Sequence, residues 1–250
     1  MPYKLIKGTF HLVGLNKKRN PVGFEPDGDS IQFKPNSPGG LDELEVVNRP
    51  YKLTQIGSVN LRFEGIDATE LHYSGARQPY PIGEEARDFV TGAFGMNPVT
   101  YISNGIKVKP PANDGQQGYI LSKQLDYHGR PVSFVFVGTI SSPDGKWIYI
   151  DSDMLKQSLN YKLLQNGLVY PLFYDTLYHD LRETMRDAAK RAFNNNKGLW
   201  PYDWSNEWID VTEQSGVEQE YTIFTKIFRR LTDFHKEHEG FVDSVFVARR

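Results

Sequence analysis

Two aspartates flank a glycine near the N-terminus, in the segment Asp27-Gly28-Asp29-Ser30. Carboxylate oxygens held on a tight turn suit a hard cation such as calcium. The segment is also typical of an ordinary turn, because Pro26 precedes it and the alternating run from Ser30 to Lys34 follows it. The residues alone therefore leave a metal ligand and a plain turn both open.

A second charged group lies at the end of a strand-like run. Residues 58–66 alternate and end at Asp67, so Arg62 lies on the expected strand while Asp67 and Glu70 follow its end. An arginine and two carboxylates can bind a phosphate and move a proton, or pair with one another on a solvated edge. A third group, 126–130, is a turn that places Arg130 at a rim, where it could be a simple solvated charge.

Taken in order, the three groups resemble the staphylococcal (micrococcal) nuclease, or thermonuclease, family. Asp27 to Ser30 is similar to the family's Asp-Gly-Asp-Thr, and Leu61 to Glu70 is similar to its Arg-Leu-x-Gly-Ile-Asp-x-Pro-Glu. Asp126-x-x-Gly129-Arg130 resembles its Asp-x-Tyr-Gly-Arg. Further similarities at 83–89, Asn160, 167–169 and 188–200 extend the resemblance from about residue 22 to 200.

The resemblance implies a calcium-dependent nuclease that hydrolyses phosphodiester bonds of DNA or RNA and leaves 3′-phosphate ends. Its implied catalytic residues are Glu70, as general base, and Arg62 and Arg130, which would bind the scissile phosphate. The implied calcium ligands are the carboxylates of Asp29 and Asp67 and the backbone carbonyl of Ala68. Tyr127 and His128 are expected to contact the substrate. Endonucleolytic and exonucleolytic cutting both remain open.

Several residues depart from the family pattern. Thr69 stands where the family has proline, and this change predicts a looser turn before Glu70. Ala68 replaces a threonine, which matters little if only its carbonyl binds the metal. His128 replaces a tyrosine. Residues 35–57 form an unusually long insertion that could gate the site or only decorate it.

The expected architecture is a β-barrel with helices, an α+β fold. The resemblance narrows it to an OB-type, five-stranded Greek-key barrel with about three helices. Residues 1–21 form an N-terminal strand or lead-in, 22–200 the nuclease domain and 201–250 a C-terminal extension. Helices are expected over 82–94, from about 152 to Asn166, and over 178–195, with Gly167 as a C-cap.

The extension carries an aromatic stripe at helical spacing over 217–236. The stripe either packs back on the barrel or binds a partner, which includes a second copy of the chain. Residues 241–247 could form a strand. Asp151 is better explained as a helix N-cap than as a metal ligand, and His235 with His238 as a solvated face rather than a metal pair.

Composition narrows the function classes. The chain has no cysteine, which excludes disulfides, thiolate zinc sites and a cysteine nucleophile. The net charge of -2 speaks against a broadly basic nucleic-acid-binding surface. Neither a signal peptide nor a membrane span is evident, so we expect a cytoplasmic protein if Met1 is the natural start and a secreted one if a signal was removed.

Two functions remain in competition. The first is an active nuclease, and the second is a catalytically inactive module of the same fold that binds nucleic acid or protein. A module freed from catalysis would be expected to lose some of the residues on which catalysis depends. All five of them are present, which favours the enzyme: Asp29, Arg62, Asp67, Glu70 and Arg130.

Overall fold

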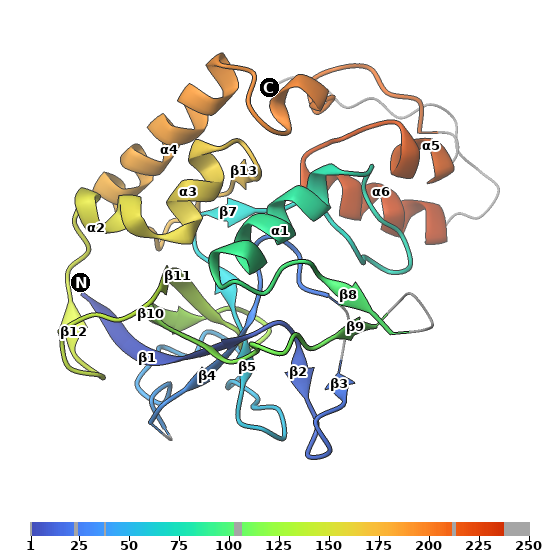
Figure 1. Ribbon diagram of the computed structural model, residues 1–250. Coiled ribbons are helices and arrows are strands. Elements are labelled where there is room, and N and C mark those ends of the chain that lie inside the picture. The colour runs from blue at the N-terminus through green and yellow to red at the C-terminus, as the bar shows by residue number, and fades with distance from the viewer. Residues whose placement is uncertain (1, 23–24, 38, 103–106, 212–213, 238–250) are drawn as a thin grey trace.

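A mixed, barrel-like sheet forms the centre of the protein (Figure 1). The computed structural model describes residues 2–22, 25–37, 39–102, 107–211 and 214–237. The strands of the barrel follow one another in space as β5 (Val59–Asn60), β4 (Gln32–Pro35), β1 (Tyr3–His11), β10 (Gln116–Leu125), β11 (Pro131–Val137) and β6 (Arg62–Phe63). A short strand, β12 (Trp147–Ile148), pairs with the start of β1.

Strand β1 lies in the middle of this sheet. It pairs antiparallel with β10 along 4–10 and with β4 along 8–11. The sheet nearly closes because β5 and β6 are separated only by Leu61: the first pairs with β4 and the second pairs in parallel with β11. The N-terminal segment, expected to be a strand or lead-in, therefore supplies a central strand of the barrel.

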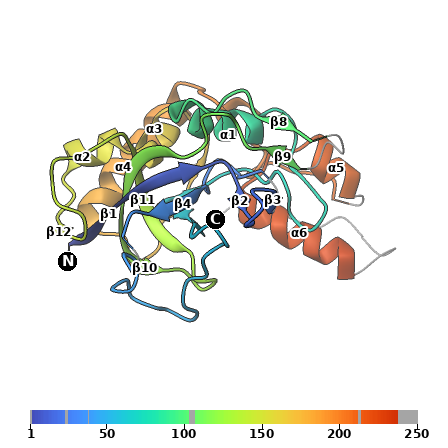
Figure 2. The ribbon, with the colours of Figure 1, turned by 60° about the horizontal axis from the view of Figure 1, so that its bottom comes forward.

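The helices gather on one side of the barrel, as Figures 1 and 2 show. They are α1 (Ile82–Ala93), α2 (Ser152–Gln157), α3 (Leu159–Gln165), α4 (His179–Asn194), α5 (Gln214–Gln219) and α6 (Thr225–Glu237). Asp151 caps α2 by accepting a hydrogen bond from the Met154 amide at 2.8 Å, which confirms its structural role. The single helix expected up to Asn166 is instead two, because Ser158 is extended and caps α3.

Buried polar contacts fix α3 to the barrel. Asn160 accepts a hydrogen bond from the Val135 amide of β11 at 3.0 Å and donates to the Glu64 and Ser133 carbonyls. Gly167, at φ +68°, follows α3 as expected and approaches the end of α4 so closely that a β-carbon would lie 2.3 Å from the Lys197 carbonyl oxygen. These contacts fix the position of the strand that carries Arg62.

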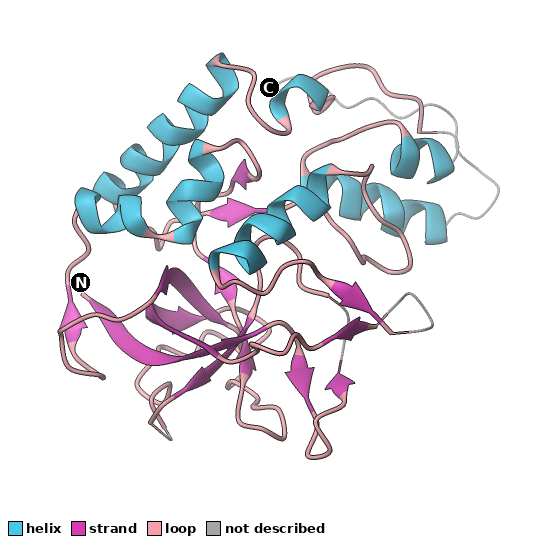
Figure 3. Cartoon of the chain, in the orientation of Figure 1, coloured by secondary structure: helices cyan, strands magenta, loops and turns pink. Residues whose placement is uncertain are grey.

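Short pairs of strands complete the fold, and Figure 3 shows how loops connect them to the barrel. They are β2 (Gly14–Leu15) with β3 (Pro21–Val22), β7 (Ile66–Asp67) with β13 (Tyr170–Pro171), and β8 (Thr100–Tyr101) with β9 (Val108–Lys109). A 3-10 turn, Trp200–Tyr202, leads into the extension. No helix in the described part of the chain combines the length and apolar character needed to cross a membrane.

The aromatic stripe of the extension packs within the chain itself and is partly buried. Phe228 and Leu231 of α6 form a small apolar cluster with Ala76, Val217 and Ile223. Phe224 packs edge-on against Tyr170. The stripe thus packs against the loop at 73–78 and the β13 region. The proposed strand at 241–247 lies outside the described residues, as does His238.

The barrel with packed helices confirms the expected fold class. In the described part of the chain, the barrel has six strands and about six helices pack on it, more than the five strands and about three helices expected. One extra strand arises where the segment 59–63 is interrupted at Leu61, and the extra helices come from the break at Ser158 and from the extension.

Candidate active site

The loop of Asp27 and Asp29 rests directly on helix α1. A β-carbon at position 28 would lie 2.3 Å from the Ala86 β-carbon, so this approach requires glycine. Ser30 donates its backbone amide to the Asp27 carbonyl, which closes the turn. The turn brings the Asp29 carboxylate under the strand end at 66–68, where it accepts a hydrogen bond from the Ala68 amide at 2.9 Å.

Arg62 joins the two predicted metal aspartates. One guanidinium nitrogen pairs with Asp29, and the other donates to Asp67 at 2.6 Å and to the Ile66 carbonyl at 3.1 Å. Arg62, Asp29 and Asp67 are all buried, with Asp67 fully inaccessible. Burial raises the pKa of Asp67, although the ion pair with Arg62 opposes this effect. The geometry is a buried ion triad rather than a pairing on a solvated edge.

Glu70 sits on a turn held by Gln78. The Glu70 amide donates to the Gln78 side chain at 3.0 Å, and the Gln78 amide donates to the Glu70 carbonyl at 2.8 Å. This reciprocal pair braces the turn that Thr69 was expected to loosen. Burial raises the pKa of the Glu70 carboxyl, with an ion pair to Arg229 opposing it. Burial, followed by the negative charges of Glu70 and Asp29, raises the pKa of Asp27.

Arg130 projects from the tight turn between β10 and β11. Asp126 accepts a hydrogen bond from the Arg130 Nε at 2.7 Å and one from its backbone amide at 2.8 Å, so one carboxylate fixes both the turn and the side chain. Gly129 in this turn has φ +82°. His128 and Tyr127 are both exposed.

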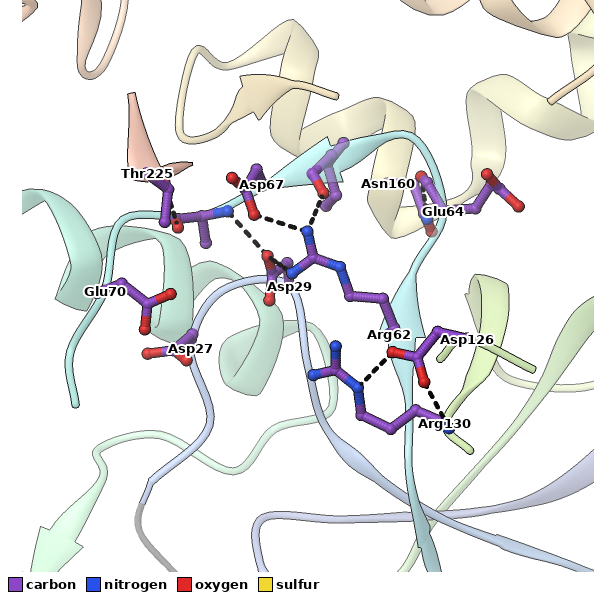
Figure 4. A network of polar contacts seen from close by, with 12 residues as sticks. Asp27, Asp29, Arg62, Glu64, Asp67, Glu70, Asp126, Arg130, Asn160 and Thr225 are labelled. Carbon is purple, nitrogen blue, oxygen red and sulfur yellow. Dashed lines mark hydrogen bonds and ion pairs between the residues drawn. The ribbon is translucent and has the colours of Figure 1, made fainter. Parts of the chain in front are cut away.

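These residues converge on one cavity of about 520 Å³. Figure 4 shows Arg62 and Arg130 pointing toward the Asp29 carboxylate, while Asp27 and Glu70 face each other beside them. Asp67 does not line the cavity, but its carboxylate accepts a hydrogen bond from Arg62, which does. Of the two expected substrate contacts, the described lining includes His128 and not Tyr127. The full lining is Asp27, Asp29, Ser30, Asn60, Arg62, Glu70, Tyr73, His128, Arg130 and Arg229.

The donor set around the cavity suits a hard cation. One carboxylate oxygen of Asp67, Oδ2, is buried and has no hydrogen-bond partner in the part of the chain that the structure describes. Five carboxylates, those of Asp27, Asp29, Asp67, Glu70 and Asp126, face three guanidinium groups, so the fully ionised cluster carries two excess negative charges. Within the described ranges, no three His, Asp or Glu residues are already arranged as a metal cluster. The expected calcium ligands are two carboxylates and one backbone carbonyl, so they do not form a cluster of three such side chains.

The extension supplies two residues that sequence reasoning did not place at the site. Thr225 of α6 donates its hydroxyl to the Ala68 carbonyl at 2.8 Å, and Arg229 donates from Nε to Glu70 at 2.5 Å. The one available signal in the sequence is the place of Arg229 within the stripe at 217–236, for which packing on the barrel and partner binding were both open. Asp27 was recognised in the turn but was not expected in the cavity wall.

Comparison with models of known protein families gives no match, and no curated protein matches the chain.

Proposed function

We propose that this chain is a calcium-dependent nuclease that hydrolyses phosphodiester bonds of DNA or RNA in the cavity described above. The observation that carries the proposal is convergence. One cavity is lined by residues from three separate parts of the sequence, namely Asp29, Arg62 with Glu70, and Arg130, and Asp67 bonds to Arg62 beside it.

We also propose that the barrel has an OB-type Greek-key fold. If the segment 59–63 is counted as one strand, the barrel has five strands that close in the order β1, β4, β5 with β6, β11 and β10. Such a short, nearly closed, mixed barrel supports an OB-type Greek-key fold. It also supports membership of the staphylococcal nuclease family, although that membership rests on the sequence resemblance.

Each side chain has a distinct task in this mechanism. Glu70 takes a proton from the attacking water as general base. The water oxygen bonds to phosphorus, the bond to the 5′ oxygen breaks, and the proton that Glu70 accepted returns through solvent to that leaving oxygen, which gives a 3′-phosphate and a 5′-hydroxyl. Arg62 and Arg130 stabilise the negative charge that grows on the non-bridging oxygens. A guanidinium suits this task because it carries a positive charge and a planar set of N–H donors that matches phosphate oxygens.

Asp29, Asp67 and the Ala68 carbonyl would hold calcium. When bound, calcium supplies Lewis-acid stabilisation and a template for the phosphate. Its two positive charges would match the excess negative charge of the cluster. Asp29 and Asp67 both accept hydrogen bonds from Arg62, so calcium would share these carboxylates with the Arg62 guanidinium.

The test is release of acid-soluble fragments from denatured DNA and from RNA, with calcium and then with a chelator. We expect cleavage in calcium at alkaline pH and none in chelator. Arg130→Ala should cut turnover severely while its melting temperature stays close to that of the wild type, because Arg130 is half-exposed at a turn. No calcium-dependent release from either substrate would contradict the proposal and favour an inactive binding module.

A further inference from the structure

Helix α6 of the extension lies against the segment 67–78, which carries Glu70. Thr225 at its first turn is buried and donates to the Ala68 carbonyl. Gln78, which holds the Glu70 turn, donates its side-chain amide to the Ile223 carbonyl just before the helix at 2.6 Å. Further along, Asp233 accepts a hydrogen bond from the Tyr73 hydroxyl at 2.9 Å. The helix is therefore attached to this segment at three separate points.

The face of α6 between these points places one charged side chain in the cavity. Arg229 donates from Nε to Glu70 Oε1 at 2.5 Å, and its Nη2 pairs with the same oxygen. The same Nη2 lies 3.7 Å from Asp67 Oδ1. The guanidinium also sits above the Tyr73 ring, 5.9 Å from its centre. Arg229 thus joins the proposed base to a proposed metal ligand.

We propose that α6 is a wall of the active site and that Arg229 is the positioning residue for Glu70. This inference rests on the proposed function. Both Arg229 bonds end on Oε1, so we assign proton transfer to the second carboxylate oxygen, Oε2. A side chain held by two donors from one planar group has little rotational freedom, which is what a general base needs to face its water.

The burial of Glu70 explains why such a partner is needed. Its side chain is only 6% exposed, and an isolated buried carboxylate is strongly destabilising. Arg62 is bonded to Asp29 and Asp67, and Arg130 to Asp126, so within the described residues Arg229 is the cation that pairs directly with Glu70.

Two other roles for Arg229 predict different kinetics. An arginine that binds substrate phosphate by itself would raise KM when removed, and its loss would add to the loss of Glu70. An arginine that blocks the base would speed the reaction when removed. A positioning arginine instead lowers kcat, and its removal has no further effect once Glu70 is gone.

The experiment is a double-mutant cycle on the full chain. Arg229→Ala, Arg229→Lys, Glu70→Gln and the double variant Arg229→Ala with Glu70→Gln are assayed for kcat, KM and unfolding free energy. Arg230→Ala is the matched control, because Arg230 is the next residue on α6 and is exposed. We expect Arg229→Ala to lower kcat by about tenfold or more with KM within about twofold, and Arg229→Lys to recover part of the loss.

In the Glu70→Gln background, removing Arg229 should change the rate by less than about twofold. Additive losses, a loss confined to KM, or a faster Arg229→Ala variant would each overturn the inference while leaving the nuclease proposal intact. A wild type that cuts nothing would instead contradict the proposed function. The unfolding free energies of the same variants still test the contact between Arg229 and Glu70 in that case. A double variant that loses less stability than the sum of the two single variants supports the contact, and a loss equal to that sum overturns it.

Discussion

The insertion at 35–57 contacts the proposed site from the Arg130 side, and the extension contacts it from the Glu70 side. The insertion acts through the backbone of the turn: Asn48 donates to the Tyr127 carbonyl at 3.1 Å, and the Pro50 carbonyl lies 2.4 Å from where a β-carbon at Gly129 would stand. None of its described residues lines the cavity. The extension, in contrast, brings the Arg229 side chain into the cavity.

This difference separates two ways in which an added segment supports a site. A backbone brace stabilises a turn whose own residues already fix the key side chain, as Asp126 fixes Arg130. A side-chain charge placed in the cavity changes the electrostatics of the group that it contacts, as Arg229 does for Glu70. Loss of the charge should therefore affect chemistry, and loss of the brace should mainly affect local stability.

The largest effect is expected from replacing Glu70, the residue that Arg229 contacts. Glu70→Gln should lower turnover by about a hundred- to ten-thousandfold, because the amide cannot accept the proton of the attacking water. Steady-state kinetics on single-stranded DNA in calcium would measure the effect. Glu85→Gln, on an exposed position of α1, is the control and should keep the wild-type rate. A Glu70→Gln variant with near-wild-type turnover would remove Glu70 from the mechanism.

Glu64 offers a contrast to Glu70, because it is also a buried carboxylate but no described residue of the insertion or the extension forms a hydrogen bond with it. Among the described residues, neither of its carboxylate oxygens has a hydrogen-bond partner, and burial raises its pKa to about 7 from 4.5. A raised carboxyl pKa means that the fold favours the neutral form. Stability from this group is therefore lost as the pH rises from 4.5 to 7, by about 3 kcal/mol in total.

The Glu64→Gln variant should lack this dependence. Its unfolding free energy relative to wild type should rise between pH 4 and pH 8 by up to about 3 kcal/mol, as measured by urea unfolding at each pH. A parallel pH dependence in both proteins would show that Glu64 is ionised in the fold.

A smaller effect is expected at the second contact of the extension. Thr225→Val removes the donor to the Ala68 carbonyl and keeps the side-chain shape. We expect a loss of about 1 kcal/mol in unfolding free energy, typical of one buried hydrogen bond. Thr184→Val, which removes a hydroxyl bond within α4, serves as the control. Equal losses of unfolding free energy in both variants would show that the hydrogen bond to Ala68 contributes no more than an ordinary bond within a helix.

The smallest effect is expected in the insertion. Asn48→Ala should lower the unfolding free energy by about 0.5 kcal/mol, because Asn48 is exposed and its bond to Tyr127 competes with water. The rate of cleavage should fall by less than about threefold. A loss of turnover as large as that of Arg229→Ala would mean that the insertion controls Arg130 directly, and the contrast between the two segments would fail.

Local sequence patterns predicted much of this arrangement. The roles of Asp29, Arg62 and Arg130 come from the family resemblance alone, but the turns and strand ends that carry these residues were predicted because each pattern spans fewer than about ten residues. The N-cap at Asp151 was found for the same reason. The structure brings these residues together through the barrel, whose strand pairing follows from alternating apolar residues.

Other features depend on contacts that no local pattern encodes. Arg229 is 159 residues from Glu70 in the chain, and its partner is decided by how α6 docks. The central place of β1 depends on its pairing with strands that follow much later, β4 and β10. Ser158 interrupts a helical pattern because its hydroxyl caps the next helix, a competition between two local structures that the pattern leaves undecided.

The most direct test of the central claim is end-group analysis after incubation of one defined single-stranded DNA with the purified wild type in calcium. We expect fragments with 3′-phosphate and 5′-hydroxyl ends that form in calcium, disappear in chelator and are strongly reduced with Glu70→Gln. Intact DNA under all alkaline conditions, or cleavage that Glu70→Gln leaves unchanged, would contradict this claim.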